Sequence, residues 1–323
     1  MSESVATSGM ATPIETFRNA ERRLFADYGV DFDERFVELP APRLRVRVIV
    51  VGDGPPLVLV HGGLSVAAQW APLLPHLKGF RLYIPDRSGC GLTEGWDHRR
   101  DDLREHGTHF ITSLLDALDL EQAPFIANSM GALWSLWFAV AHPKRAMRLA
   151  LLGCPALLEG TSAPFPMRLM AVPGLNRLLF SQVRPDVAGA RQSMKMIGHT
   201  STLDRIPSAF LQVGAASSAL PTFRVHFLSL IESALTLAGP RRQLIFGGDL
   251  SGRVRCPVVL LWGQADPFGS LAAARSAAAL MPEAHVETVG VGHLPWLDEP
   301  ERCGELLCDF LAANPKPQVS PNA

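Results

Sequence analysis

The stretch that decides the fold is Phe125-Ile126-Ala127-Asn128-Ser129-Met130-Gly131-Ala132, with Ser129 at its centre. A run rich in β-branched and aromatic residues leads into this serine and a helix-forming run leaves it, which predicts a strand-to-helix junction. Ala127 and Gly131 stand two positions before and after the serine, so the strand and the helix can approach closely in a tight turn. This pattern is typical of a nucleophile elbow, which holds a hydroxyl clear of the sheet. An ordinary helix N-cap serine would also fit the local pattern.

The rest of the chain supplies partners for this serine. A serine hydroxyl needs a base to become a nucleophile, and the base needs an acid to orient it. Asp266 follows the buried-strand pattern at 257–263, and His293 follows the strand pattern at 286–289. The carboxyl ends of parallel strands meet at one edge of a sheet. We therefore predict a catalytic triad of Ser129, Asp266 and His293, with Asp298 as an alternative acid.

Two backbone N–H groups are expected to complete the site. The run Pro56-Leu57-Val58-Leu59-Val60 predicts a strand that leads into His61-Gly62-Gly63, where glycines let the backbone approach a substrate closely. We predict that the N–H groups of Gly63 and Met130 form an oxyanion hole, and that His61 holds the turn in place. Candidate pocket residues are Gly62, Leu64, Asn128 and Trp296, of which Trp296 would either line the pocket or lie buried under the loop that carries His293.

A further glycine-rich loop, residues 86–93, follows the strand pattern at 80–84, and Asp86 is expected to fix this loop by accepting hydrogen bonds. With this loop, five motifs stand in the order of the α/β-hydrolase superfamily, which the sequence resembles over residues 35–155 and 255–312. The motifs are His61-Gly62-Gly63, the 86–93 loop, the Ser129 elbow, Trp262-Gly263-Gln264-Ala265-Asp266 and Gly292-His293. The resemblance implies an α/β fold with a mostly parallel central sheet, helices on both faces and an inserted helical cap.

The chain is expected to divide into four parts. These are an N-terminal extension with a helix (1–30), an α/β-hydrolase core (31–155 and 251–312), a helical cap (156–250) and a flexible tail (313–323). Alternating patterns at 36–39 and 44–51 predict a hairpin at one sheet edge, after which strands and helices alternate as in a parallel sheet. A cap inserted at 156–250 would cover the triad and exclude water from it.

Apolar spacing predicts several of the helices. One is marked by Trp70, Leu73, Leu74 and Leu77, and the cap is predicted to hold helices at Pro166–Phe180, Asp186–Ile197 and Phe223–Leu237. The N-terminal helix is expected to begin with a capping box at Thr12-Pro13-Ile14-Glu15. The cap methionines at 167, 170, 194 and 196 would either fill a small helical core or form an adaptable apolar wall for a substrate.

Composition limits the classes of protein that remain. The chain has 323 residues, of which 47% are hydrophobic and 19% charged, and its formal net charge is −1. This balance suits one large globular domain with an inserted lobe, and it gives no electrostatic reason to expect nucleic acid or an anionic membrane. The N-terminus lacks a secretory pattern, and no apolar run reaches the roughly 18–20 residues that span a bilayer. The five cysteines have no metal-binding spacing and are expected to be small buried hydrophobic residues. A cytoplasmic protein is predicted, mainly because targeting signals are absent.

The resemblance and the triad order together predict a serine hydrolase that cleaves a carboxylic ester, lactone or thioester through an acyl-enzyme. Haloalkane dehalogenases and epoxide hydrolases carry aspartate at the elbow, so the serine at position 129 excludes their chemistry. An alternative is a C–C bond hydrolase for a diketo-type ring-cleavage product, because Asn128-Ser129-Met130-Gly131 resembles the elbow of those enzymes. They usually carry tryptophan directly after the histidine, where this chain has Leu294. A third alternative, from another class, is a ligand-binding relative with vestigial catalysis.

Partners are expected to be few. No motif calls for a metal or an organic cofactor, and we expect none. The predicted substrate is a small to medium apolar acyl compound, with no nucleic acid and no membrane span. The N-terminal helix lies outside the usual core, where it would either pack on the body of the protein or form the contact of a homodimer.

Overall fold

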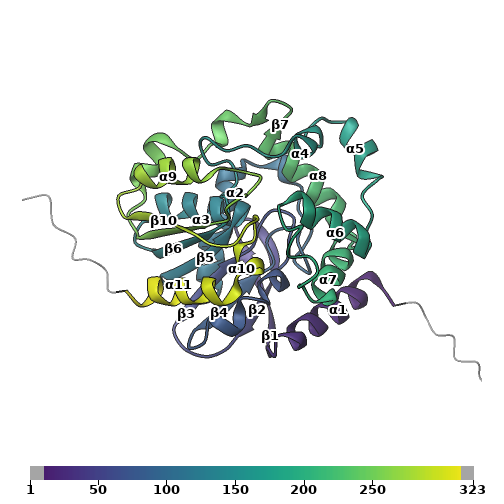
Figure 1. Cartoon of the computed structure of the whole chain (residues 1–323), viewed down its shortest axis with the longest axis horizontal. Helices are drawn as coiled ribbons and strands as arrows, with labels where there is room; N and C mark the ends of the chain where they lie inside the picture. Colours follow the sequence, from purple (N-terminus) through teal and green to yellow (C-terminus); the bar gives the residue numbers. More distant parts are fainter. Residues whose placement is uncertain (1–10, 314–323) are drawn as a thin grey trace, which may run out of the picture.

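The structure is a computed structural model that describes residues 11–313. Its main sheet has eight strands in the order β1-β2-β4-β3-β5-β6-β9-β10 (Figure 1). The strands are β1 Asp33–Pro40, β2 Arg43–Val51, β3 Pro56–Val60, β4 Arg81–Pro85, β5 Ala123–Asn128, β6 Ala146–Leu152, β9 Val258–Trp262 and β10 Ala284–Thr288. The first two form the predicted antiparallel edge hairpin, and β2 also pairs antiparallel with β4. The remaining pairs are parallel, so the predicted fold class is confirmed.

Helices surround this sheet. The α-helices are α1 Pro13–Asp27, α2 Leu103–Ala117, α3 Ser129–Ala141, α4 Phe165–Leu169, α5 Leu175–Phe180, α6 Val187–Met196, α7 Ser208–Ser218, α8 Phe223–Ala234, α9 Leu271–Ala279, α10 Pro295–Asp298 and α11 Pro300–Ala312. Short 3₁₀ helices are η1 Ala67–Trp70, η2 Leu74–His76, η3 His98–Arg100, η4 Arg242–Leu244 and η5 Gly248–Arg253, and β7 Leu235–Thr236 pairs with β8 Gly239–Pro240. The capping box predicted at the start of α1 is present.

Each central strand contributes to two apolar layers. In β3, Val58 and Val60 belong to a cluster with residues of α2 and α3, whereas Leu57 and Leu59 belong to a cluster with residues of η1 and α11. Successive side chains of a strand point to opposite faces of a sheet, so the two clusters lie on its two sides. Both faces of the sheet are therefore covered, and only the ends of the strands are left for a site.

Two helix predictions are wrong, and proline explains both. The single helix expected around Trp70–Leu77 is two 3₁₀ turns, because Pro72 and Pro75 lack the N–H that an α-helix needs. The helix expected at Pro166–Phe180 is broken into α4 and α5 at Pro173-Gly174, where Gly174 has a φ of 87°. The third predicted cap helix ends at Ala234 rather than Leu237, because the chain there turns into β7.

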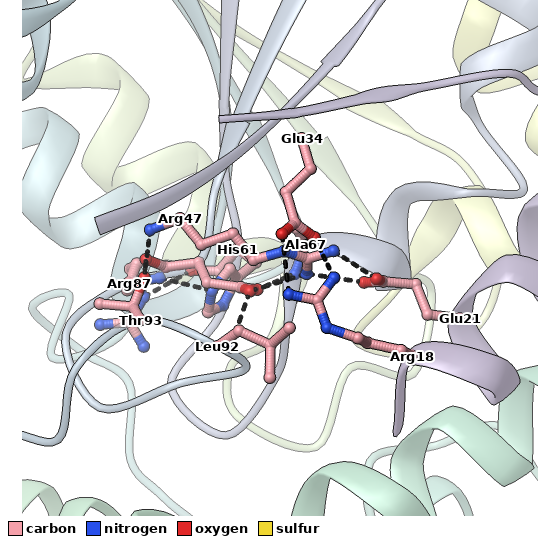
Figure 2. Close-up of polar contacts among 10 residues, drawn as sticks. Arg18, Glu21, Glu34, Arg47, His61, Ala67, Arg87, Leu92 and Thr93 are labelled. Carbon is pink, nitrogen blue, oxygen red and sulfur yellow. Dashed lines mark hydrogen bonds and ion pairs between the residues drawn. The ribbon is translucent and has the colours of Figure 1, made fainter. Parts of the chain in front are cut away.

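Buried charge ties α1 to the sheet. Arg47 on β2 is fully buried and pairs with Glu21 of α1, with Glu34 of β1 at 3.0 Å and with Asp86 at 3.1 Å (Figure 2). Asp86 also accepts the backbone N–H of Ala67 at 2.7 Å, as its predicted loop-fixing role requires. The same helix also packs against α7. The N-terminal helix is thus part of the body of the protein.

Within residues 11–313, no helix combines the length and the apolar character needed to cross a membrane. Most of the predicted flexible tail, residues 314–323, lies outside the described residues, as do residues 1–10 at the start of the N-terminal extension.

Candidate active site

Ser129 begins α3 directly after β5, and its backbone has a φ of 51°. Few residues other than glycine adopt this left-handed conformation, and in a tight strand-to-helix turn it marks strain at a functional position. A Cβ atom at position 131 would lie 2.3 Å from the Val60 carbonyl oxygen and 2.5 Å from that of His61. Gly131 is therefore required for α3 to approach β3 so closely, which is the close approach that the elbow pattern predicts.

Asp266 and His293 are hydrogen-bonded directly to each other. The Nδ1–H of His293 donates to Oδ2 of Asp266 at 2.8 Å, so Nε2 of the neutral ring is free to accept a proton. Backbone N–H groups of Cys154 and Phe268 donate to Oδ2 and Oδ1 of the same carboxylate at 2.8 and 2.9 Å. Burial alone would raise the pKa of Asp266, but the His293 ring and these two N–H groups lower it below its ordinary value. Asp266 is thereby held ionised and in one orientation.

The loops that carry these two residues cross at glycines. A Cβ atom at position 263 would lie 2.0 Å from the Gly292 carbonyl oxygen. A Cβ atom at position 292 would lie 2.6 Å from the ring of His199. Glycine at 263 and 292 thus lets the Asp266 loop, the His293 loop and the chain after α6 pack together.

Every backbone N–H group of loop 291–294 is bonded. The N–H groups of Val291 and Gly292 donate to Oδ2 of Asp298 at 2.8 and 2.9 Å. The N–H group of His293 donates to the Ile197 carbonyl at 3.0 Å, and that of Leu294 donates to Nε2 of His199 at 2.9 Å. Nδ1 of His199 in turn donates to Oδ1 of Asp298 at 3.0 Å. Asp298 and His199 therefore hold the backbone around His293, and neither contacts the His293 ring in the way Asp266 does.

Replacing Asp298 by asparagine is expected to make the unfolding free energy depend less on pH between about pH 4 and pH 2. Burial would raise the pKa of Asp298, but hydrogen bonds from His199, Thr202 and the Gly292 N–H lower it from 3.8 to about 2. The unfolded chain therefore binds more protons than the folded chain, and the stabilisation by Asp298, present above about pH 4, is lost as the pH falls towards 2.

Urea unfolding at pH 6 and pH 3 tests this expectation. The difference in unfolding free energy between wild type and Asp298→Asn should narrow at the lower pH. Asp204→Asn, at an exposed position, serves as the control. An equal difference at both pH values would contradict the role assigned to Asp298.

A cavity of about 210 Å³ opens beside Ser129 and His293. Its remaining lining includes Gly63 and Met130, and its walls come largely from apolar side chains of 156–250. Of the four cap methionines, Met167 and Met194 line it and the other two do not. The structure thus brings the predicted nucleophile, base and oxyanion-hole residues to one cavity.

The N–H groups of Gly63 and Met130 are available. Met130 lies in the first turn of α3, where N–H groups have no partner within the helix. Across the described part of the chain, no hydrogen bond uses the Gly63 N–H as donor, whereas its carbonyl accepts from Nε2 of His226 at 2.9 Å.

Three of the four residues predicted to line the pocket do so. Gly62, Leu64 and Asn128 line the cavity, but the amide group of Asn128 is occupied in donating to the carbonyls of Leu152 and His293. Trp296 is not among the lining residues, so of its two predicted places the pocket wall is wrong and the buried position under the loop is the one observed. It is fully buried and stacks on Trp70 with ring centroids 4.3 Å apart, because α10 turns its apolar side towards the layer under η1.

Several residues at the site escaped the sequence argument. Leu24 of α1 lines the cavity, as does Gln69 of η1, whose Nε2 is buried and has no hydrogen-bond partner among the described residues. The N–H groups of Cys154 and Phe268 that hold Asp266 were also missed. Only Phe268 left a signal, since it stands two residues after the acid as in an Asx turn. In the stretch from 11 to 313, no group of three histidine, cysteine or acidic side chains could bind a metal ion.

Comparison with protein families gives one match to most of the chain. Residues 55–300 match the model described as the alpha/beta hydrolase fold. Curated relatives include 2-hydroxymuconate semialdehyde hydrolase of Pseudomonas sp. (strain CF600), 28% identical over 287 residues, which cover 85% of this chain and 93% of the relative. Another is 2-hydroxy-6-oxo-2,4-heptadienoate hydrolase of Pseudomonas putida, 28% identical over 280 residues, which cover 81% of this chain and 91% of the relative.

Solved structures with the same fold include two kinds of enzyme. A carboxylesterase from Bacillus subtilis superposes with a TM-score of 0.74 at 22% identity, covering 94% of this chain and 99% of the esterase. The 2-hydroxy-6-oxo-6-phenylhexa-2,4-dienoate hydrolase from a Rhodococcus species superposes with a TM-score of 0.71 at 22% identity, covering 88% of this chain and 100% of that hydrolase. At this identity the superpositions support the fold and leave the bond that is cleaved open.

Proposed function

Because the chain belongs to the α/β-hydrolase fold family, we propose that it is a serine hydrolase that cleaves a carboxylic ester, lactone or thioester of a neutral, apolar acyl compound. The observation that carries this proposal is the cavity beside Ser129 and His293. Among the described residues that line it there is no aspartate, glutamate, lysine or arginine.

The proposed reaction gives each of the site residues one role. Oγ of Ser129 attacks the substrate carbonyl carbon while Nε2 of His293 takes the hydroxyl proton. Asp266 keeps the ring in the tautomer that can accept this proton and stabilises the charged ring that results. The N–H groups of Gly63 and Met130 bind the oxygen that becomes negative. His293 then gives the proton to the leaving group, and water hydrolyses the acyl-enzyme by the reverse sequence.

The lack of charge in the cavity favours a neutral substrate. A carboxylate taken from water into an apolar site without a cationic partner loses several kcal/mol of solvation free energy. Besides the two proposed oxyanion donors, the lining residue Gln69 has a buried Nε2 without a hydrogen-bond partner among the described residues, and an amide N–H of this kind suits a neutral oxygen acceptor such as a carbonyl or an ether. The cavity therefore suits an apolar acyl chain that carries at most a neutral polar group.

C–C bond hydrolysis is the second candidate. The curated relatives support it better than they support ester cleavage, since their names describe hydrolases of semialdehyde and dienoate compounds. A dienoate carries a carboxylate, and the lining of this cavity holds no cation that would pair with it. Leu294 also stands where the related C–C hydrolases usually carry tryptophan. We therefore rank ester cleavage first on the geometry.

Fluorophosphonate labelling tests whether Ser129 is an activated nucleophile. The purified protein is expected to be labelled once per chain, and Ser129→Ala is expected to remain unlabelled while its circular dichroism spectrum stays unchanged. Equal labelling of the two proteins would contradict the proposed nucleophile. No labelling of folded wild type would instead favour a binding function with vestigial catalysis.

A matched pair of esters tests the neutral cavity. p-Nitrophenyl pentanoate and the mono-p-nitrophenyl ester of glutaric acid have acyl chains of the same length, and only the second ends in a carboxylate. We expect kcat/KM to be at least about 100-fold lower for the charged ester, because its carboxylate would be buried unpaired. A 2-hydroxy-6-oxo-dienoate should be turned over more slowly than the neutral ester. Preference for the charged compounds would overturn the ranking and favour C–C hydrolysis.

A further inference from the structure

The peptide bond between Gly62 and Gly63 is held firmly on the side away from the cavity. The Gly62 carbonyl accepts from Nη2 of Arg87 at 2.7 Å and from Nδ1 of His61 at 2.8 Å. A trans peptide is planar, and its N–H points opposite to its carbonyl. Holding the Gly62 carbonyl from behind therefore turns the Gly63 N–H, the proposed oxyanion donor, towards the cavity that Gly63 lines.

His61 can make this contact in one tautomer only. Its Nε2 accepts the backbone N–H of Arg87 at 2.9 Å (Figure 2). The proton must therefore be on Nδ1, where it donates to the Gly62 carbonyl. Complete burial, reinforced by the nearby Arg87 charge, lowers the pKa of His61 well below its ordinary value. The ring therefore stays neutral, and the positive charge behind this peptide comes from Arg87 alone.

Arg87 is a buried cation without a carboxylate partner. Its side chain is fully buried, and its Nε donates to the His61 carbonyl at 2.9 Å. The guanidinium lies 4.5 Å from the ring centroid of Trp134, and its Nη1 has no hydrogen-bond partner among the described residues. The neighbouring carboxylate of Asp86 is occupied by Arg47. No ion pair found within residues 11–313 includes Arg87, and a buried charge left in this state costs several kcal/mol.

We propose that Arg87 is a positioning residue for the oxyanion hole, and that its charge stabilises the negative oxygen formed when Ser129 attacks. This inference rests on the proposed function. In that step the bond from Oγ of Ser129 to the carbonyl carbon forms, the carbonyl π pair moves to oxygen, and the hydroxyl proton goes to His293. The hydrogen bond from Arg87 polarises the Gly62–Gly63 peptide and strengthens the Gly63 N–H as a donor. Because the opposite charge exists only during the reaction, the effect falls on kcat rather than KM.

A trifluoromethyl ketone that adds to Ser129 reports on this charge directly. The adduct is a tetrahedral hemiketal whose oxygen occupies the oxyanion hole, and ¹⁹F NMR follows the ionisation of that oxygen with pH. We expect Arg87→Gln to lower kcat by about 10- to 100-fold with little change in KM, and to raise the hemiketal pKa by about 1 to 2 pH units. Arg87→Lys keeps the charge, and should keep the hemiketal pKa within about half a pH unit of wild type.

Arg47, a second buried arginine, provides the control that distinguishes an effect of charge at the oxyanion hole from a general loss of stability. Arg47→Met should be destabilised at least as much as Arg87→Gln, yet the hemiketal pKa in its folded fraction should equal that of wild type. A folded Arg87→Gln with wild-type kcat and hemiketal pKa would overturn the inference. Should Arg87→Gln fail to fold, Arg87→Lys decides, and a rise of a full pH unit or more there would overturn it. Failure of wild type to form the adduct, or an equal adduct with Ser129→Ala, would instead overturn the proposed function.

Discussion

Replacing Asp266 by asparagine is expected to lower kcat about 10⁴-fold, as wrong-tautomer variants of such triads do. The carboxylate accepts at both oxygens: Oδ2 from His293 and the Cys154 N–H, and Oδ1 from the Phe268 N–H. An amide has only one oxygen, so in either orientation its NH₂ faces a backbone donor. With the NH₂ at the Oδ2 position, Nδ1 of His293 must accept, and Nε2 then carries the proton that blocks attack by Ser129.

The kcat of Asp266→Asn should be measured on the best p-nitrophenyl ester beside that of Asp298→Asn. Asp298 makes a matched control because its side chain is only 3% exposed and is bonded to a histidine, and because it follows His293 in the chain. We expect Asp298→Asn to lose less than about 10-fold, since it supports the loop backbone and does not contact the His293 ring. A larger loss for Asp298→Asn than for Asp266→Asn would move the role of the acid to Asp298.

Replacing Arg47 by methionine is expected to lower the unfolding free energy by about 3–5 kcal/mol, because it leaves buried carboxylates without their cation. Glu21 is 1% exposed and Asp86 is fully buried, and both pair with Arg47. Glu34 loses one of its two arginine partners. The loss should be visible in equilibrium urea unfolding and should weaken the attachment of α1 to the sheet.

Arg18 provides the matched control for this prediction. Arg18 lies on α1 and pairs with Glu34 of β1 at 2.7 Å, but its side chain is 32% exposed. Arg18→Met is therefore expected to cost less than about 1 kcal/mol. Adding Glu21→Leu to Arg47→Met should restore part of the lost stability, because one unpaired carboxylate is then removed. Equal costs for Arg47→Met and Arg18→Met would show that the buried network contributes no more than a surface pair.

Much of the site could be predicted because its parts are local patterns. A strand that ends in a serine between small residues, an aspartate after one strand and a histidine after another all depend on neighbours in sequence. The glycines at 131, 263 and 292 belong to the same motifs, and the structure shows contacts that only glycine allows. The two helix errors had a visible signal in Pro72 and in Pro173-Gly174, since proline interrupts helices whatever the apolar spacing around it.

Other features depend on residues far apart in the chain. Asp266 is oriented by the N–H of Cys154, 112 residues away, and the His293 loop by His199, 95 residues from Leu294. Backbone N–H groups carry no side-chain identity, so no residue pattern marks them as donors. From the sequence, Trp296 can either line the pocket or lie buried under the loop, and only its packing against Trp70 decides between the two.

The sequence by itself determined the fold family, the chain order of the proposed nucleophile, acid and base, and the glycines that their turns require. It could do so because backbone conformation is set by each residue and its immediate neighbours. Only the tertiary structure decided that the cavity is uncharged, that Leu24 of the N-terminal helix lines it, and that Arg87 stands behind the oxyanion hole without a counter-ion. Those features depend on which distant segments exclude water from a charge, and burial is a property of the packed chain rather than of any stretch within it.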